Sequence, residues 1–376
     1  MNKQTCKTCV MDTTDPGITF DEYGVCDHCR GFDLWIRPEW NNEVHETDQI
    51  QRIAEQIRIA GKNADFDCLL GLSGGLDSSY LLHVAVKELG LRPLVFHVDG
   101  GWNSNIAVSN IEAMINELNL DLFTAVINWE EMRDLQLAFF KSGVSHLDVP
   151  QDHAFIATLY HFALKHKVKY ILNGGNISTE GVRNPLSWLY YGSDIRQIRD
   201  IHTKFGERKL IDFPLTNVLW HKIYLRYIQG IKVVKPLNYV NFTKDKAIKL
   251  LEADYGWTSY PQKHFESRFT RFFEGYWLPS RFGYDTRKVQ FSSLILTGQM
   301  LREDALKKLR EPALTPLEVR NEKEFVASKL RISVDALEAF ERLPKSTYRD
   351  FKSMSLLYDL GAKTLQKIGI ERAIKR

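Results

Sequence analysis

The segment at residues 73–79 reads S-G-G-L-D-S-S and joins an apolar run at 68–72 to apolar residues at helical spacing over 80–86. The run predicts a buried strand and the spacing predicts a helix. Glycines at such a junction let backbone N–H groups converge on one point, where the helix N-terminus adds partial positive charge. Serine hydroxyl groups add donors, and a carboxylate can hold magnesium. The predicted phosphate-binding residues are Gly71, Ser73, Gly74, Gly75, Asp77, Ser78 and Ser79, with Asp77 also the magnesium ligand.

The segment lacks the lysine of the Walker loop, and an ordinary Gly/Ser turn at a helix cap is the alternative interpretation.

Four of the five cysteines form two C-x-x-C pairs, Cys6 with Cys9 and Cys26 with Cys29. This spacing, with turn sequences between the pairs, is typical of a structural zinc site with four thiolate ligands. Two disulfides or an iron–sulfur cluster are the alternatives. The fifth, Cys68, falls in the predicted strand and is expected to be a buried apolar residue.

Composition is that of a folded protein, with 376 residues, 44% hydrophobic and 26% charged residues. A net charge of +3 gives no general attraction for nucleic acid. No apolar run approaches the length of a membrane span, and the first residues contain no apolar signal core. We therefore expect a cytoplasmic protein with no nucleic-acid or membrane partner.

Predicted strands alternate with predicted helices along the first part of the chain, which favours an α/β fold with a doubly wound parallel sheet. Ligands of such sheets bind at the carboxyl ends of strands. The predicted strands are 68–72, 92–99, 120–128 and 169–172, and the predicted helices are 48–60, 80–86, 105–118 and 151–167.

The S-G-G-x-D-S pattern resembles the pyrophosphate loop of the ATP-pyrophosphatase (PP-loop) superfamily, which has an adenine nucleotide α-hydrolase-like fold. Its members cleave ATP between the α and β phosphates and attach AMP to a substrate oxygen. In that superfamily the end of the second strand contacts adenosine and a later glycine-bearing loop closes over the nucleotide. The resemblance implies ATP contacts at His97, Asp99, Asn173, Gly174 and Gly175, although 173–176 alone also fits a plain turn.

From residue 1 to about residue 310, the chain resembles the N-acetyl sugar amidotransferases of this superfamily. The resemblance rests on the cysteine pairs, the S-G-G-L-D-S-S segment, H-V-D-G-G-W-N-S at 97–104 and the block 257–288. It implies conversion of the 3-acetamido group of UDP-2,3-diacetamido-2,3-dideoxy-mannuronic acid into an acetamidino group for lipopolysaccharide O-antigen. A related branch acts on pseudaminic- and legionaminic-type sugars. ATP, Mg²⁺ and structural Zn²⁺ are the implied cofactors.

A nucleotide-linked uronate is negatively charged, so its site should contain cationic side chains. Within 263–273, Lys263, Ser267 and Arg271, or His264, Arg268 and Arg271, are expected to share a helix face, although a solvated basic stripe is the alternative. His153, near the start of a predicted helix, is a candidate acid–base residue or part of an N-cap. The predicted substrate-binding residues are Arg183, Lys263, His264, Arg268 and Arg271, and the predicted catalytic residues are Ser73, Asp77 and His153.

Three domains are expected: a zinc ribbon at 1–46, an ATP-binding domain at 47–240 and a helical substrate- or partner-binding region at 241–376. A tRNA-modifying PP-loop enzyme and a nucleotide sensor without catalysis are the rival interpretations. Sulfur transfer needs further reactive cysteines, and glutamine hydrolysis needs a nucleophile such as cysteine. Only Cys68 lies outside the ribbon. The resemblance likewise implies a separate glutaminase, similar to the histidine-pathway glutaminase and its cyclase-type companion, that supplies ammonia.

Overall fold

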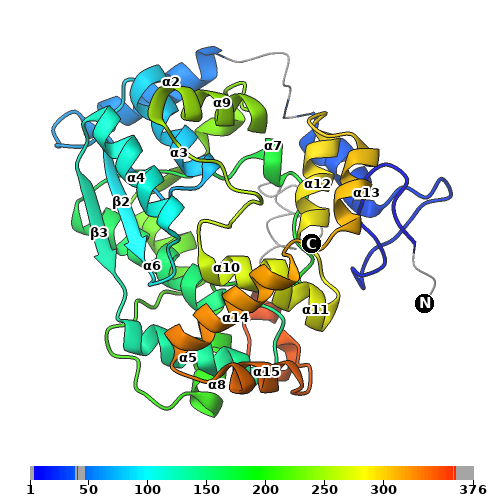
Figure 1. Ribbon diagram of the computed structural model, residues 1–376. Helices are drawn as coiled ribbons and strands as arrows, with labels where there is room; N and C mark the ends of the chain where they lie inside the picture. Colours follow the sequence, from blue (N-terminus) through cyan, green and yellow to red (C-terminus); the bar gives the residue numbers. More distant parts are fainter. Residues whose placement is uncertain (1–3, 39, 41–46, 359, 361–376) are drawn as a thin grey trace.

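The computed structural model describes residues 4–38, 40, 47–358 and 360. Its centre is a five-stranded parallel sheet with the order β3-β2-β1-β4-β5 (Figure 1). Because β1 lies between β2 and β4, the loops after β1 and β4 face each other at the point where the strand order reverses. The predicted doubly wound parallel sheet is confirmed. The strands are β1 (Cys68–Gly71), β2 (Pro93–Asp99), β3 (Leu122–Val126), β4 (Tyr170–Leu172) and β5 (Lys232–Val234).

Alternating residues of β1 point to opposite faces of the sheet, as the period of a strand requires. Cys68 and Leu70 pack in one core, whereas Leu69 packs in another with Phe96 of β2. The face with Cys68 is covered by α2 (Thr47–Gly61), α3 (Leu76–His83), η2 (Val84–Glu88), α4 (Asn105–Leu118) and α9 (Lys244–Tyr255). The other face is covered by α6 (Val149–Lys165) and η3 (Trp220–Ile228).

Helix α9 lies beyond the predicted domain boundary at 240 and 241, yet its Leu251 packs in the same core as Leu70 of the sheet. The prediction of a helical C-terminal region is confirmed. A second core, built around Phe140, Phe269, Phe272 and Trp277, joins helices from the middle of the chain to helices near its end (Figure 1). These are α5 (Trp129–Ser142), α8 (Ile195–Phe205), α10 (Arg268–Phe272), η5 (Phe273–Trp277), α11 (Leu278–Phe282), α14 (Pro316–Leu330) and α15 (Val334–Glu341).

The N-terminal segment with the cysteine pairs packs against α12 (Arg287–Leu296) and α13 (Arg302–Arg310), as Figure 1 shows. Arg302 donates to the carbonyl oxygens of Cys6 and Cys9, and Val10 N–H donates to Ser292. Among the described residues, no helix combines the length and apolarity of a membrane span. The remaining elements are α1 (Asp27–Gly31), η1 (Phe32–Ile36), α7 (Ile177–Glu180), η4 (Pro236–Asn238), α12 (Arg287–Leu296), α13 (Arg302–Arg310) and η6 (Tyr348–Asp350).

Candidate functional site

The loop between β1 and α3 turns at Gly74, which has a φ of +78°. A Cβ atom at Gly74 would lie 2.5 Å from the carbonyl oxygen of Ala107 in α4, so only glycine allows this approach. The carbonyl oxygen of Gly74 accepts hydrogen bonds from Asn110 Nδ2 at 3.2 Å, Trp257 Nε1 at 3.1 Å and the Tyr260 hydroxyl group at 3.1 Å. These three bonds fix the orientation of the peptide group.

Two serine hydroxyl groups hold the other side of the same loop. Ser78 Oγ accepts from Ser73 N–H at 3.2 Å and lies 3.0 Å from Ser73 Oγ, which accepts from Gly75 N–H. Gly75 is the N-cap of α3 and provides no side-chain cap. The first turn of α3 therefore presents N–H groups that can donate hydrogen bonds to an anion. Ser79 is fully buried.

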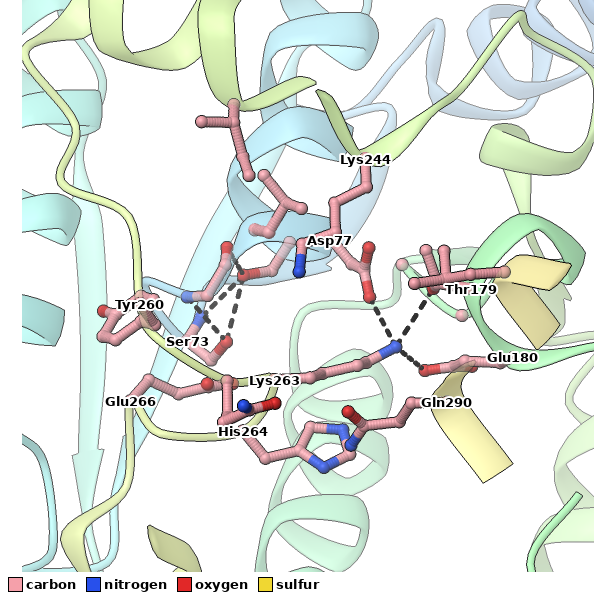
Figure 2. Close-up of a pocket in the computed structure, with 18 of the residues that line it drawn as sticks. Ser73, Asp77, Thr179, Glu180, Lys244, Tyr260, Lys263, His264, Glu266 and Gln290 are labelled. Atoms are coloured by element: carbon pink, nitrogen blue, oxygen red, sulfur yellow. Dashed lines mark hydrogen bonds and ion pairs between the residues drawn. The ribbon is translucent and has the colours of Figure 1, made fainter. Parts of the chain in front are cut away.

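Lys263 connects the loop to α7, as Figure 2 shows. Its Nζ lies 2.9 Å from Asp77 Oδ2 and 2.7 Å from Glu180 Oε1, and it donates to Thr179 Oγ1 at 3.1 Å. Burial acts to lower the pKa of Lys263, but the two carboxylates outweigh burial and hold that pKa above its usual value. Lys263 is therefore a charged group beside the phosphate-binding loop.

Asp77 Oδ1 is buried and has no hydrogen-bond partner. A carboxylate oxygen in this condition is suited to a hard cation such as Mg²⁺, which prefers oxygen ligands. The residues present fit the magnesium ion that the sequence predicts.

Two cavities, each of about 410 Å³, meet at Ser73, His264 and Glu266. The first lies over the phosphate-binding loop and includes Ser73, Gly75, Asp77, Ser78, Lys244, Lys263 and Trp257. The second extends from the ends of β1 and β2. Its lining includes an apolar set, Phe96, Val98, Phe155, Ile156 and Leu159, and an acidic set, Asp148, Asp152 and Glu274.

Several predicted ATP-binding residues line these cavities. Asn173, Gly174 and Gly175 line the first cavity, and a Cβ atom at Gly174 would lie 3.2 Å from the backbone of Asp77. Gly71 and His97 line the second cavity. His97 Nδ1 donates to the Leu72 carbonyl oxygen and Nε2 accepts from Asn103, so the ring is held in one orientation.

Asp99 is outside both sets of lining residues. Its carboxylate accepts from Gly101 N–H at 2.7 Å and from Asn103, so it shapes the loop after β2.

His153 does not have the geometry of an acid–base residue. It is fully buried, its Nδ1 donates to the Gly192 carbonyl oxygen at 2.8 Å, and its Nε2 accepts from Thr216 N–H at 3.0 Å. Burial lowers its pKa. Because both ring nitrogens are occupied by backbone groups, the structure gives this histidine a structural role and corrects the catalytic prediction.

The predicted common helix face of the basic residues is wrong. Helix α10 begins at Arg268, so Lys263 and His264 lie in the preceding loop, where His264 has a φ of +67°. Arg268 pairs with Glu322 at 3.0 Å, and Arg271 pairs with Glu318 at 2.6 Å.

These two arginines therefore tie α10 to α14 and line neither cavity. Arg183 is exposed and is also outside the residues that line the two cavities. Of the five predicted substrate-binding residues, Lys263 and His264 reach the site.

His264 lies in the wall between the cavities, with Nδ1 3.2 Å from Glu274 Oε1. Burial acts to lower its pKa, but the Glu274 carboxylate outweighs burial and raises the pKa to about 9. Burial also raises the pKa of Glu266, which lines both cavities as well.

The sequence reasoning assigned no role to several residues of the first cavity. Thr179 and Glu180 come from a segment without a recognisable short pattern. Trp257 and Glu266 lie in the block 257–288 that resembles the N-acetyl sugar amidotransferases, and this resemblance was the available signal.

The four N-terminal cysteines form a cluster that can hold a metal ion. All are fully buried, and Sγ–Sγ distances are 3.8 Å for Cys6 and Cys29, 3.6 Å for Cys9 and Cys26, and 3.7 Å for Cys26 and Cys29. Four sulfurs at about 2.3 Å from a tetrahedral zinc ion lie about 3.8 Å apart. The donor set thus fits structural zinc, and the separations exceed the roughly 2.05 Å of a disulfide bond.

Residues 266–365 match the family described as "LPS biosynthesis protein WbpG-like, C-terminal domain". This match confirms the resemblance proposed from the sequence and continues past residue 310, where that resemblance ended. No curated protein sequence matches the chain.

Similar solved structures include NMN synthetase from Francisella tularensis, with a TM-score of 0.29, 16% identity and coverage of 60% of this chain and 92% of that chain. The NH3-dependent NAD synthetase from Campylobacter jejuni has a TM-score of 0.29, 14% identity and coverage of 80% and 98%. NAD+ synthetase from Burkholderia pseudomallei has a TM-score of 0.27, 17% identity and coverage of 61% and 99%. Values this low transfer neither fold nor reaction to this chain.

Proposed function

We propose that this protein is an ATP-dependent amidotransferase that adenylates an N-acetyl group of a nucleotide-linked sugar and replaces its oxygen with ammonia. The observation that carries the proposal is the junction of two cavities at Ser73, where the phosphate-binding loop begins. A nucleotide laid across this junction has its phosphates in one cavity and its base in the other.

The apolar side of the second cavity suits adenine. Phe96, Val98, Phe155 and Leu159 offer flat and aliphatic surface beside the ends of β1 and β2. The β and γ phosphates then lie over the loop at 73–79, where the N-terminus of α3 and Lys263 stabilise negative charge.

Lys244 adds a second cation to the first cavity. Burial lowers its pKa. A pyrophosphate leaving group would give the Lys244 ammonium group a negative partner. Magnesium, held by Asp77, would neutralise further charge on the phosphates.

In the proposed reaction, the amide oxygen of the acetamido group attacks the α phosphorus of ATP. The bond from that phosphorus to the bridging oxygen breaks, pyrophosphate leaves, and release of the amide N–H proton gives an O-adenylyl imidate. Ammonia then forms a C–N bond to the activated carbon, and AMP leaves with the former amide oxygen. The residues of the loop act mainly by positioning and by stabilising charge.

The proposed acceptor is UDP-2,3-diacetamido-2,3-dideoxy-mannuronic acid, in lipopolysaccharide O-antigen synthesis. The sequence resemblance supports this choice, as does the matching WbpG-like domain at residues 266–365. A pseudaminic- or legionaminic-type sugar is the alternative acceptor.

A separate glutaminase is proposed as the source of ammonia. Four of the five cysteines belong to the metal-binding cluster, and Cys68 is fully buried in β1. Burial raises the pKa of the Cys68 thiol, which disfavours the nucleophilic thiolate. The same facts disfavour a tRNA-thiolating enzyme.

The test is product analysis with MgATP, the UDP-linked diacetamido sugar and either ammonium chloride or glutamine. We expect AMP, pyrophosphate and amidine in equal amounts with ammonium, and none with glutamine until a glutaminase is added. Asp77→Asn should reduce turnover by roughly 100-fold or more, since it removes a charge that acts at the phosphates, with little change in melting temperature. ADP and orthophosphate as products would exclude the proposed reaction.

A further inference from the structure

The second cavity has acidic lining residues but lacks the lysines that line the first cavity. Asp148, Asp152, Glu266 and Glu274 line the cavity, and no lysine or arginine is among the described residues that do so. The residues of its lining that can become cationic are the three histidines His97, His146 and His264. An anionic sugar acid is therefore disfavoured at this end, whereas a small cation is favoured.

We propose that this end of the second cavity binds ammonium and that Asp148 accepts its proton, so that neutral ammonia is released beside the adenylated carbon. This inference rests on the proposed function and adds to it the site of the nitrogen substrate. In this step a proton moves from ammonium to the Asp148 carboxylate, which gives ammonia and a carboxylic acid. The ammonia lone pair then forms the C–N bond as AMP leaves.

Asp148 is held for such a role by neutral donors. The Thr270 hydroxyl group donates to its Oδ2 at 2.5 Å, and Gln151 Nε2 donates to its Oδ1 at 3.1 Å. No cation of the chain pairs with this carboxylate among the described ion pairs. Each oxygen keeps a further lone pair for an ammonium N–H, because a carboxylate oxygen accepts more than one hydrogen bond.

The surroundings match the basicity of Asp148 to this task. Burial, followed by the Asp152 carboxylate, raises the pKa of Asp148 to about 8. His146 faces it from the same segment, with Nε2 3.5 Å from Asp152, and Glu274 faces it from η5. A base whose pKa lies near the working pH can both accept a proton and release it again.

A third cavity, bounded by Asp15, Gly17, Tyr348 and other residues, shares His146 with the second cavity. The His146 ring is fixed by a bond from Nδ1 to the Tyr190 carbonyl oxygen at 2.8 Å. His146 therefore lies between the third cavity and the acidic residues of the second cavity.

The experiment separates adenylation from amination. Sugar-dependent exchange of labelled pyrophosphate into ATP reports the first step and needs no nitrogen donor. Asp148→Asn should leave exchange within about two-fold but lower kcat/KM for ammonium by roughly 100-fold near pH 7, the usual contribution of a general base. The defect should shrink as pH rises and free ammonia increases. Hydroxylamine, which is unprotonated at neutral pH, should be used as the nucleophile equally well by the variant and the wild type.

Two further variants make the result decisive. Thr270→Val keeps the carboxylate and removes its hydroxyl donor, so it should show a smaller defect confined to ammonium. Asp134→Asn is the matched control, since Asp134 is also buried but binds His202 and the backbone of Glu207 away from the cavities. It should leave the ammonium kinetics unchanged.

Normal exchange together with an unchanged kcat/KM for ammonium in Asp148→Asn would overturn the inference. A second result would also overturn it. In that result Mg²⁺ alone competes with ammonium in the wild type but not in Asp148→Asn, and Asp148→Asn fails to use hydroxylamine. Absence of sugar-dependent exchange in the wild type would overturn the proposed function and the inference together.

Discussion

Replacing Gly74 by alanine tests whether the phosphate-binding loop depends on the close approach of α4. An L-residue at a φ of +78° costs about 1–2 kcal/mol. The new Cβ atom would also meet the Ala107 carbonyl oxygen at 2.5 Å, so the loop must move away from α4. That movement would weaken two or three hydrogen bonds to the Gly74 carbonyl oxygen, each worth about 0.5–1.5 kcal/mol.

The sum is about 2–6.5 kcal/mol of lost preference for the functional loop. If this loss falls on the loop, MgATP affinity should fall by roughly 30-fold or more, because 1.4 kcal/mol corresponds to a factor of ten. Calorimetric titration with MgATP measures this directly and requires no knowledge of the sugar. Denaturant unfolding measures the part of the loss that appears in global stability.

Gly90→Ala is the matched control. Gly90 has a φ of +59°, but a Cβ atom there would meet nothing within 4 Å. It should lose about 1–2 kcal/mol of stability from backbone strain alone and keep its MgATP affinity. A Gly74→Ala protein that binds MgATP within a few-fold of wild type would refute this account of the loop, as would equal loss of affinity in both variants.

Two other predictions concern the metal cluster and the wall between the cavities. Cys26→Ser should bind less than one zinc per chain by metal analysis and melt at least about 5 °C lower, since each kcal/mol shifts the melting temperature of a large domain by about 2–4 °C; full zinc content at an unchanged melting temperature would contradict the assignment. The pKa of His264 is raised from 6.5 to about 9 by Glu274, so its contribution to stability is fully present below pH 6.5 and is lost as pH rises through about 9. Denaturant unfolding from pH 6 to 10 should show this loss in the wild type and not in His264→Asn, a residue that tolerates positive φ; parallel curves for the two proteins would show that the ion pair does not contribute.

Local patterns in the sequence predicted the sheet, the phosphate-binding loop and the cysteine cluster. Each depends on neighbours within a short stretch, such as the glycine pair at Gly74 and Gly75 between a strand and a helix. The apolar run at 68–72 also indicated that Cys68 would be buried, and the structure places it in the core.

The roles of isolated polar side chains depended on distant partners and could not be predicted in the same way. Arg268 is occupied by Glu322 of α14, and His153 by the backbone of Gly192 and Thr216. In both cases the partner lies tens of residues away in the chain, and no sequence pattern predicts the contact. The same holds for Asp148, whose donor Thr270 comes from α10.

The chain positions of the three donors to the Gly74 carbonyl oxygen have a consequence for how the loop folds during synthesis. Asn110 follows the loop closely in the chain, but Trp257 and Tyr260 are synthesised much later. On the ribosome, residues 73–79 therefore emerge with one donor in reach and wait for the other two. Since translation proceeds from the N-terminus, a nascent chain that ends before Trp257 has all of residues 73–79 but lacks two of the three donors to the Gly74 carbonyl oxygen.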